Sequence, residues 1–297
     1  MESLIINSKY NSGLSRFFSS SVLNELARKG HSSFFNEMLS VSGLHEIIDE
    51  NITMSAFLQI VYNHLFKNYR SEYIYKNAIA NKILLGKHSL NTAFMLTEFR
   101  VADCKADLVV LNGTSNVYEI KSEFDSVDRL KRQIYAYSQV FDFIHVITST
   151  SPFQITKVAS CIPKSVGIMS FTNRNAIHTV REAESGRRFV KPDIIFDSLR
   201  KTEYTSIIKE QYGFIPDLPN TQIHKVCREL FARLPSETAH DCMVKVLKAR
   251  GKCKRLKDFI TDSPECLRAY SINSGLSIKE TSRFREMLNA KCRSFMR

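Results

Sequence analysis

The sequence predicts an α/β protein in which a mixed β-sheet is preceded and followed by helical segments. Between residues 94 and 148, short runs rich in Val, Ile, Leu, Phe and Tyr are interleaved with apolar residues at helical spacing. The stretches before and after this region carry mainly helical patterns. At 297 residues, the chain is long enough for a substantial core and for more than one domain. We therefore divide it into residues 1–70, 71–186 and 187–297.

Residues 1–70 are expected to form an accessory helical segment. Apolar residues recur at helical spacing over 20–27, 34–39 and 55–66, with serines as candidate N-caps. Its histidines stand singly, and a single histidine is more often structural than a ligand. Whether the segment covers the core or contacts a partner molecule stays open.

Residues 71–186 are expected to form the core, in the element order helix, three strands, helix, strand. The elements are a helix over 72–85 that ends at Gly86, strands over 94–101, 106–111 and 117–121, a helix over 127–141 and a strand over 143–148. The second and third strands form a hairpin, because the residues between them include Asn and Gly, which turns favour. A further hairpin over 166–180 extends or flanks the sheet.

Residues 187–297 are expected to form a basic helical region. Helices are predicted over 198–211, 223–234 and 238–249, with two more after residue 264. The net charge is +12, and residues 151–297 carry all of the excess, with 27 basic and 15 acidic residues. The densest basic run, 245–257, includes Lys254, Arg255 and Lys257. Such a run favours an anionic partner such as nucleic acid, and the alternative is a solvated helix face.

The sequence favours a cytoplasmic protein that does not enter a membrane. Seven cysteines are scattered without a Cys-x-x-Cys pair or a Cys/His cluster at zinc-ligand spacing, which is typical of free thiols in a reducing compartment. The amino terminus lacks the basic and apolar regions of a signal peptide. No apolar run is long enough to span a bilayer.

Two carboxylates and one ammonium are expected on a single face of the first hairpin. Side chains alternate along a strand, so Glu119 and Lys121 share one face and Ile120 points to the other. The hairpin can bring Asp107 onto the face of Glu119. Hard cations such as Mg²⁺ take one or two carboxylates in a shell completed by water and phosphate, and a lysine can steady the developing charge. A Glu-x-Lys triplet alone also occurs on ordinary solvated strands.

These residues resemble a known signature. Asp107, a gap of eleven residues and Glu119-x-Lys121 look like the motif of the PD-(D/E)XK nuclease superfamily, with Ala106 where the nominal proline would stand. Gln133-x-x-x-Tyr137 on the next helix resembles the QxxxY element of the RecB-type branch. The resemblance covers roughly residues 72–186, with its specific part in 98–142. It implies a restriction-endonuclease-like αβββαβ core, like that of a poorly characterised bacterial branch.

The resemblance also implies roles at the metal. Asp107, Glu119 and a further acidic residue would hold Mg²⁺ or Mn²⁺, and Lys121 would position or activate the attacking water. We favour Glu98 as the further ligand because it lies on the strand before Asp107, and Glu72 on the first helix is the alternative.

The helix over 127–141 is expected to support the site. Gln133 and Tyr137 lie four residues apart, so they share one helix face, which in the resembled family looks toward the Glu-x-Lys strand. The alternative is that Tyr137 packs in the core and Gln133 is merely exposed. Three basic residues of this region are candidates for holding backbone phosphates: Arg129, Lys131 and Arg132.

The favoured hypothesis is therefore a Mg²⁺- or Mn²⁺-dependent DNA endonuclease, of a kind found in bacterial phage defence, restriction, repair or mobile elements. A homodimer is one expectation, since two DNA strands need two cuts, and a partner protein is another. We expect Asp107→Ala or Lys121→Ala to remove cleavage and leave folding largely intact. The alternative is a non-catalytic nucleic-acid-binding protein on a nuclease scaffold.

Overall fold

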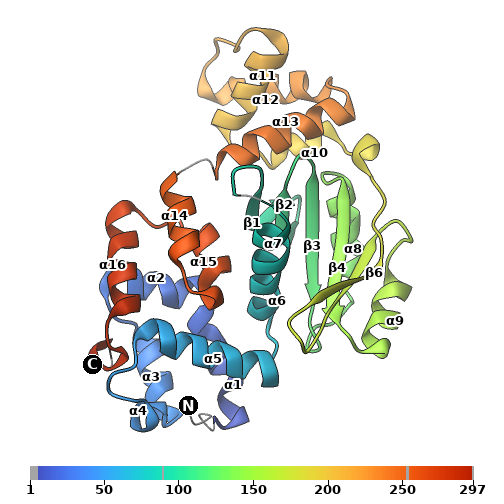
Figure 1. Ribbon diagram of the computed structural model, residues 1–297. Helices are drawn as coiled ribbons and strands as arrows, with labels where there is room; N and C mark the ends of the chain where they lie inside the picture. Colours follow the sequence, from blue (N-terminus) through green and yellow to red (C-terminus); the bar gives the residue numbers. More distant parts are fainter. Residues whose placement is uncertain (1–5, 89, 252–253, 296–297) are drawn as a thin grey trace. The chain divides into compact units, whose positions relative to one another are not determined.

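The structure is a computed structural model that describes residues 6–88, 90–251 and 254–295, without the side chains of Asn220, Lys254 and Arg255. Its contacts divide the chain into two compact units (Figure 1). Unit 1 is Met1–Asn81 together with Lys254–Arg297, and unit 2 is Lys82–Cys253. This division differs from the three consecutive segments expected from the sequence, because the last helices pack with the first ones.

Unit 1 is helical. Its α-helices are α1 (Asn11–Ser15), α2 (Ser20–Lys29), α3 (Ser33–Val41), α4 (Leu44–Ile47), α5 (Met54–Asn68), α6 (Glu72–Ile79), α14 (Lys254–Asp262), α15 (Arg268–Asn273) and α16 (Ile278–Asn289). Ser19, Ser32 and Thr53 are N-caps. Their side-chain oxygens accept hydrogen bonds from main-chain amides in the first turns of α2, α3 and α5, respectively. Helix α16 packs on α2 and α5, and an isolated bridge joins Thr53 to Lys291. These contacts bind the two ends of the chain into one unit.

Unit 2 is built on a six-stranded mixed sheet, which confirms the predicted α/β class. The strands are β1 (Phe94–Val101), β2 (Cys104–Leu111), β3 (Ser115–Lys121), β4 (Phe143–Ser149), β5 (Gly167–Phe171) and β6 (Ile177–Arg181), in the order β1-β2-β3-β4-β5-β6. Strands β1, β2 and β3 pair antiparallel, β3, β4 and β5 pair parallel, and β6 pairs antiparallel with β5. All five predicted core and hairpin regions therefore contribute strands.

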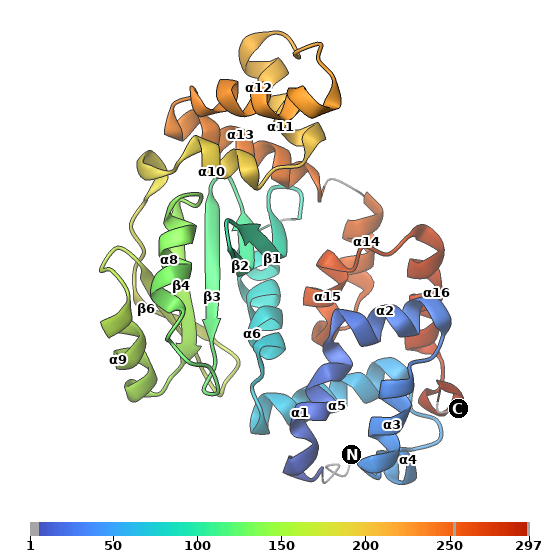
Figure 2. The ribbon, with the colours of Figure 1, turned by 180° about the vertical axis from the view of Figure 1, so that it is seen from behind.

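Helices α8 (Leu130–Ser138) and α9 (Pro152–Cys161) make the crossovers between the parallel strands. Helix α8 lies along the sheet and contacts β2 and β4 (Figures 1 and 2). Such crossovers are right-handed, so two successive ones in the same direction place both helices on one face of the sheet. Helix α9 was not predicted from the sequence, because only Val158 of this helix is buried and the helix therefore lacks a broad apolar face.

The predicted helix over 72–85 is present but continues further. Helix α6 runs into a π-helical turn (Ala80–Leu84) and then into α7 (Leu85–Lys87). Gly86 therefore lies inside the last turn, and the expected cap at Gly86 is wrong, since His88 follows the helix instead.

Unit 2 also contains four of the helices that follow the sheet in sequence. These are α10 (Pro192–Asp197), α11 (Lys201–Tyr212), α12 (Asn220–Ala232) and α13 (Ser236–Ala249), which lie together in Figure 1. Phe196 is their aromatic centre, with its ring near those of Tyr204 and Phe231. The expected basic helical region is thus divided between the units. Among the described helices, none has the length and apolar character needed to cross a membrane.

Candidate active site

The face of the sheet that carries the candidate site is set by strand register. On the antiparallel pair β2–β3, Leu108 lies opposite Tyr118 and Val109 opposite Val117. One step further, this register places Asp107 opposite Glu119, so the two carboxylates share a face. Lys121 lies two residues after Glu119 on the same strand and the same face. The structure thus brings Asp107, Glu119 and Lys121 together as the sequence predicts.

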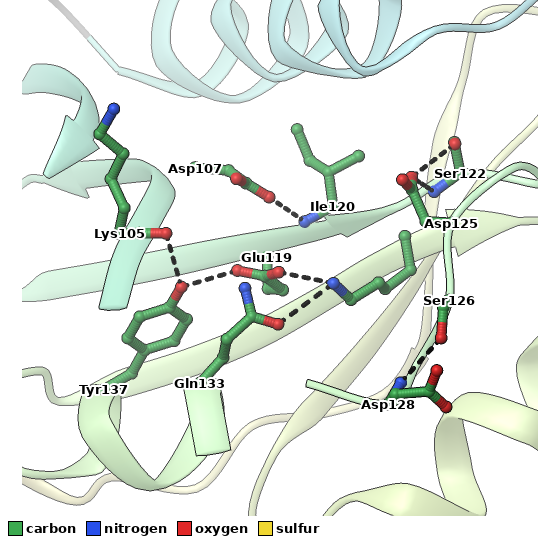
Figure 3. Close-up of polar contacts among 11 residues, drawn as sticks. Lys105, Asp107, Glu119, Ile120, Ser122, Asp125, Ser126, Asp128, Gln133 and Tyr137 are labelled. Atoms are coloured by element: carbon green, nitrogen blue, oxygen red, sulfur yellow. Dashed lines mark hydrogen bonds and ion pairs between the residues drawn. The ribbon is translucent and has the colours of Figure 1, made fainter. Parts of the chain in front are cut away.

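Helix α8 adds two polar side chains to this face (Figure 3). Lys121 Nζ lies 2.8 Å from Glu119 Oε1 and donates to Gln133 Oε1 at 3.2 Å. The Tyr137 hydroxyl lies 2.8 Å from Glu119 Oε2 and 2.9 Å from the main-chain oxygen of Lys105. Burial, and then the negative charge of Glu119, raise the pKa of Tyr137, so the phenol stays a donor. Gln133 and Tyr137 therefore fix the two charged groups of β3.

The ion pair at the centre of this network is buried. Glu119 is 1% exposed and Lys121 is 5% exposed. Burying two charges costs several kcal/mol per ion unless each is paired and hydrogen-bonded, and both conditions are met here. Tyr137 is buried and also contacts the site, so the alternative that it serves packing alone is incomplete, and Gln133 is half-buried.

Asp107 is the most accessible acidic residue of the group. It is half-buried, and its Oδ2 accepts the main-chain amide of Ile120 at 2.8 Å. The regular main-chain pairing of β2 with β3 stops at the Leu108–Tyr118 pair. Beyond that pair, the amide of Ile120 bonds to the Asp107 side chain. The carboxylate is therefore held at the sheet by the backbone of β3, in register with Glu119 and partly exposed.

Glu98 does not join the other two carboxylates as expected. Its side chain is 55% exposed and pairs with Lys105 Nζ at 2.7 Å. Its φ of 54° is in the left-handed region, which turns the side chain away from the direction of a regular strand. The alternative, Glu72, belongs to unit 1, where it pairs with Lys76 at 2.6 Å.

The two central carboxylates nevertheless fit a hard cation by their chemistry. Among the residues that the structure describes, no three His, Cys, Asp or Glu side chains gather closely enough to hold a metal ion. Mg²⁺ commonly uses only one or two carboxylates and keeps several waters. Asp107 and Glu119 supply that donor set, and Glu119 would share an oxygen that now accepts from Lys121 or Tyr137.

The basic residues expected to hold phosphates are dispersed. Arg129 and Lys131 are exposed at the start of α8, while Arg132 forms an exposed pair with Asp103 at 2.9 Å. Lys257 is half-buried on α14 in unit 1. The side chains of Lys254 and Arg255 lie outside the described residues.

Two polar features of unit 2 were missed by sequence reasoning. After β3, the amide and hydroxyl of Ser122 both donate to Asp125 Oδ2, at 2.9 and 2.6 Å, which fixes the loop that follows Lys121 (Figure 3). Near the start of β4, buried Asp142 accepts bonds from residues far away in sequence. The first could have been recognised as a local Ser-x-x-Asp turn, but the second carries no local signal.

The comparisons with known proteins concern the region that contains this site. A family model described as bacteriophage P4 protein cII matches residues 66–266, more than half of the chain. The chain belongs to this family. The match includes all six strands of the sheet and helices α8 to α13.

Protein cII of Enterobacteria phage P4 is 27% identical to the chain over 153 residues. The aligned region covers 50% of this chain and 56% of protein cII, so the chain spans about half the length of this curated relative. Among solved structures, the SPO1766 protein of unknown function from Silicibacter pomeroyi is 16% identical, with a TM-score of 0.26, over 48% of this chain and 73% of that protein. None of these names states an activity. The chemistry of this chain must therefore be argued from its own residues.

Proposed function

We propose that the chain is a metal-dependent nuclease that hydrolyses phosphodiester bonds in DNA. The observation that carries the proposal is the shared sheet face on which Asp107, Glu119 and Lys121 meet Gln133 of α8. These side chains supply oxygen ligands for a hard cation and one fixed positive charge for a phosphoryl group. The order of the same residues in the sequence resembles PD-(D/E)XK nucleases, which supports the same reaction class.

Each residue has a role that follows from its contacts. Asp107 and Glu119 would hold Mg²⁺ or Mn²⁺, which when bound polarises a phosphoryl oxygen and lowers the pKa of a bound water. Lys121 would position or activate the attacking water and steady the charge that develops, because Glu119 and Gln133 fix its ammonium. Tyr137 orients the Glu119 carboxylate from the opposite side.

Purified protein incubated with supercoiled plasmid, linear duplex DNA and single-stranded DNA tests the proposal. We expect nicking or linearisation with Mg²⁺ or Mn²⁺, none with EDTA, and none for Asp107→Ala. Asp128→Ala is the matched control, since Asp128 is an exposed carboxylate in the loop after β3. Metal-dependent cleavage that persists in Asp107→Ala would overturn the assignment of the site.

Lys121→Ala is a weaker test than the sequence suggested. Lys121 is buried, and its removal leaves Glu119 as an uncompensated buried charge, which typically costs about 3–5 kcal/mol. The expectation that this variant folds normally therefore does not follow from the structure. Asp107 is half-buried and remains the better position.

The second candidate function is nucleic-acid binding without catalysis. It is favoured by the net charge of +12. The basic excess is shared by the two units, with 17 basic and 12 acidic residues in unit 1 and 25 and 18 in unit 2. This candidate predicts salt-sensitive DNA binding that is indifferent to Mg²⁺ and to Asp107.

A further inference from the structure

A row of polar residues continues from Lys121 across the sheet. Strand register places Lys121 beside Thr148 of β4, Thr148 beside Ser170 of β5, and Ser170 opposite His178 of β6. Residues in register on paired strands have their side chains on the same face. The row therefore lies on the face of Glu119 and Asp107, near the carboxyl ends of the parallel strands.

Thr148 is the unusual member of this row. Its side chain is 0% exposed, and its Oγ1 has no hydrogen-bond partner among the described residues. Most buried hydroxyls in proteins are hydrogen-bonded, and one left unsatisfied costs about 1–3 kcal/mol. A valine would fill the same space without that cost. The hydroxyl therefore makes no hydrogen bond that serves the fold among the described residues, and polar groups that break local rules often mark functional sites.

Lys121 has donor capacity that its contacts do not use up. An ammonium group has three N–H donors, and its two acceptors in the network are Glu119 Oε1 and Gln133 Oε1. Thr148 is its in-register neighbour, yet no direct bond joins the two side chains. Polar groups on neighbouring strands that do not bond each other directly can be bridged by a water molecule.

We propose that Lys121 and Thr148 together bind the water that attacks the phosphodiester. The inference rests on the proposed nuclease function and adds Thr148 to its catalytic residues. Lys121 donates a hydrogen bond to the water oxygen, and Thr148 Oγ1 accepts a hydrogen bond from one O–H of the water, which leaves a lone pair of the water directed at phosphorus. The oxygen bonds to phosphorus, the bond from phosphorus to the leaving sugar oxygen breaks, and the proton lost by the water passes through solvent to that leaving oxygen.

Three variants test this inference. Thr148→Val removes the hydroxyl at nearly constant volume, Thr148→Ser keeps it, and Ser170→Ala removes the next hydroxyl of the same row as a matched control. We measure kcat and KM for DNA cleavage, and the thermal midpoint of the metal-free proteins. For Thr148→Val we expect kcat to fall about tenfold or more with little change in KM.

The same variant should not be less stable. Because the hydroxyl has no hydrogen-bond partner among the described residues, its removal is expected to leave the midpoint within about 2 °C of the wild type. Thr148→Ser should retain most of the activity, and Ser170→Ala should cleave like the wild type. Loss of activity with unchanged stability is a combination that a purely structural threonine would not give.

The outcomes separate this inference from the proposed function. If the wild type cleaves and Thr148→Val cleaves equally well, Thr148 has no part in the reaction and the inference alone is overturned. A variant with both lower stability and lower activity also overturns it, because Thr148 then serves the fold. A wild type without metal-dependent cleavage overturns the proposed function, and this inference with it.

Discussion

Tyr137 shows how a single hydroxyl serves both the fold and the candidate site. It is fully buried, and its oxygen lies between Glu119 Oε2 and the main-chain oxygen of Lys105. Because a phenol has one proton, it satisfies these two acceptors by sharing. The hydroxyl therefore ties α8 to both β2 and β3 at the position of the buried carboxylate.

Tyr137→Phe should destabilise the protein. The variant keeps the ring but leaves Glu119 Oε2 without its donor, which typically costs about 1–3 kcal/mol in free energy of unfolding. Urea denaturation measures this change. Tyr135→Phe on the same helix is the control, since Tyr135 is 64% exposed, and it should be neutral. Equal stability of both variants would show that the Tyr137 hydroxyl contributes nothing to the network.

His145 of β4 makes stability depend on pH. Burial lowers the pKa of His145 to about 4. Its ring stacks on that of Tyr118, with the ring centroids 4.9 Å apart, and its Nδ1 has no hydrogen-bond partner among the described residues. The folded protein therefore binds fewer protons than the unfolded chain between pH 6.5 and 4. The contribution of His145 to the free energy of unfolding is complete above pH 6.5, the ordinary pKa of histidine. It is lost as the pH falls from 6.5 to 4, by roughly 3 kcal/mol at most.

His145→Gln should flatten the pH dependence of stability between pH 6.5 and 4. Denaturation midpoints at several pH values measure the slope, and His178→Gln, at an exposed position on β6, is the control. Part of the slope should remain, because burial also lowers the pKa of His240. An unchanged slope in His145→Gln would contradict a neutral, buried His145.

Among the elements, the start of β4 is held by one carboxylate. Asp142 accepts bonds from the hydroxyls of Thr114 and Ser185, each at 2.5 Å, and from the amide of Arg187 at 3.1 Å. Burial alone would raise its pKa, but these bonds outweigh it and hold the pKa of Asp142 below its ordinary value. The carboxylate thereby joins the β2–β3 turn, β4 and the segment that leads to α10.

Asp142→Ala should lower the free energy of unfolding by about 1–3 kcal/mol, because three donors that are only partly buried lose their shared, charged acceptor. Chemical denaturation measures the effect. Asp217→Ala, at an exposed position between α11 and α12, should change stability by less than about 0.5 kcal/mol. A neutral Asp142→Ala would mean that water satisfies these donors equally well.

The contrast between Glu119 and Glu98 shows what the sequence could predict. Alternation along β3 and helical spacing along α8 are local rules, so the shared faces of Glu119 with Lys121 and of Gln133 with Tyr137 could be predicted. Glu98 lies on a predicted strand, but its left-handed φ breaks the alternation at that residue. Nothing in the neighbouring residues signals this break.

Thr148 and Asp142 show where sequence reasoning stops. The role of Thr148 depends on the register of β4 against β3, which a central apolar strand does not reveal. The partners of Asp142 lie 28 and 43 residues away along the chain. The burial of Lys121 was also missed, because burial depends on which elements cover a face and not on the strand alone.

For the whole molecule, the two ends of the chain close one unit and the middle forms the other. The sequence did not predict this arrangement, because it depends on contacts between α2 and α16, two helices separated by most of the chain. The match to the P4 protein cII family begins at residue 66 and ends at residue 266, so it spans the whole of unit 2. The region shared with the family therefore includes the whole sheet.

Binding and cleavage measured in the same samples show whether this face of the sheet hydrolyses DNA. Wild type and Asp107→Ala are each titrated against labelled duplex and single-stranded DNA in EDTA, and Mg²⁺ is then added to the same samples. We expect the two proteins to bind with equal affinities in EDTA, within about twofold, since phosphate contacts and not Asp107 supply the affinity. On addition of Mg²⁺, only the wild type should cleave. Equal binding with no cleavage by either protein, or equal cleavage by both, would show that Asp107 does not belong to a nuclease site.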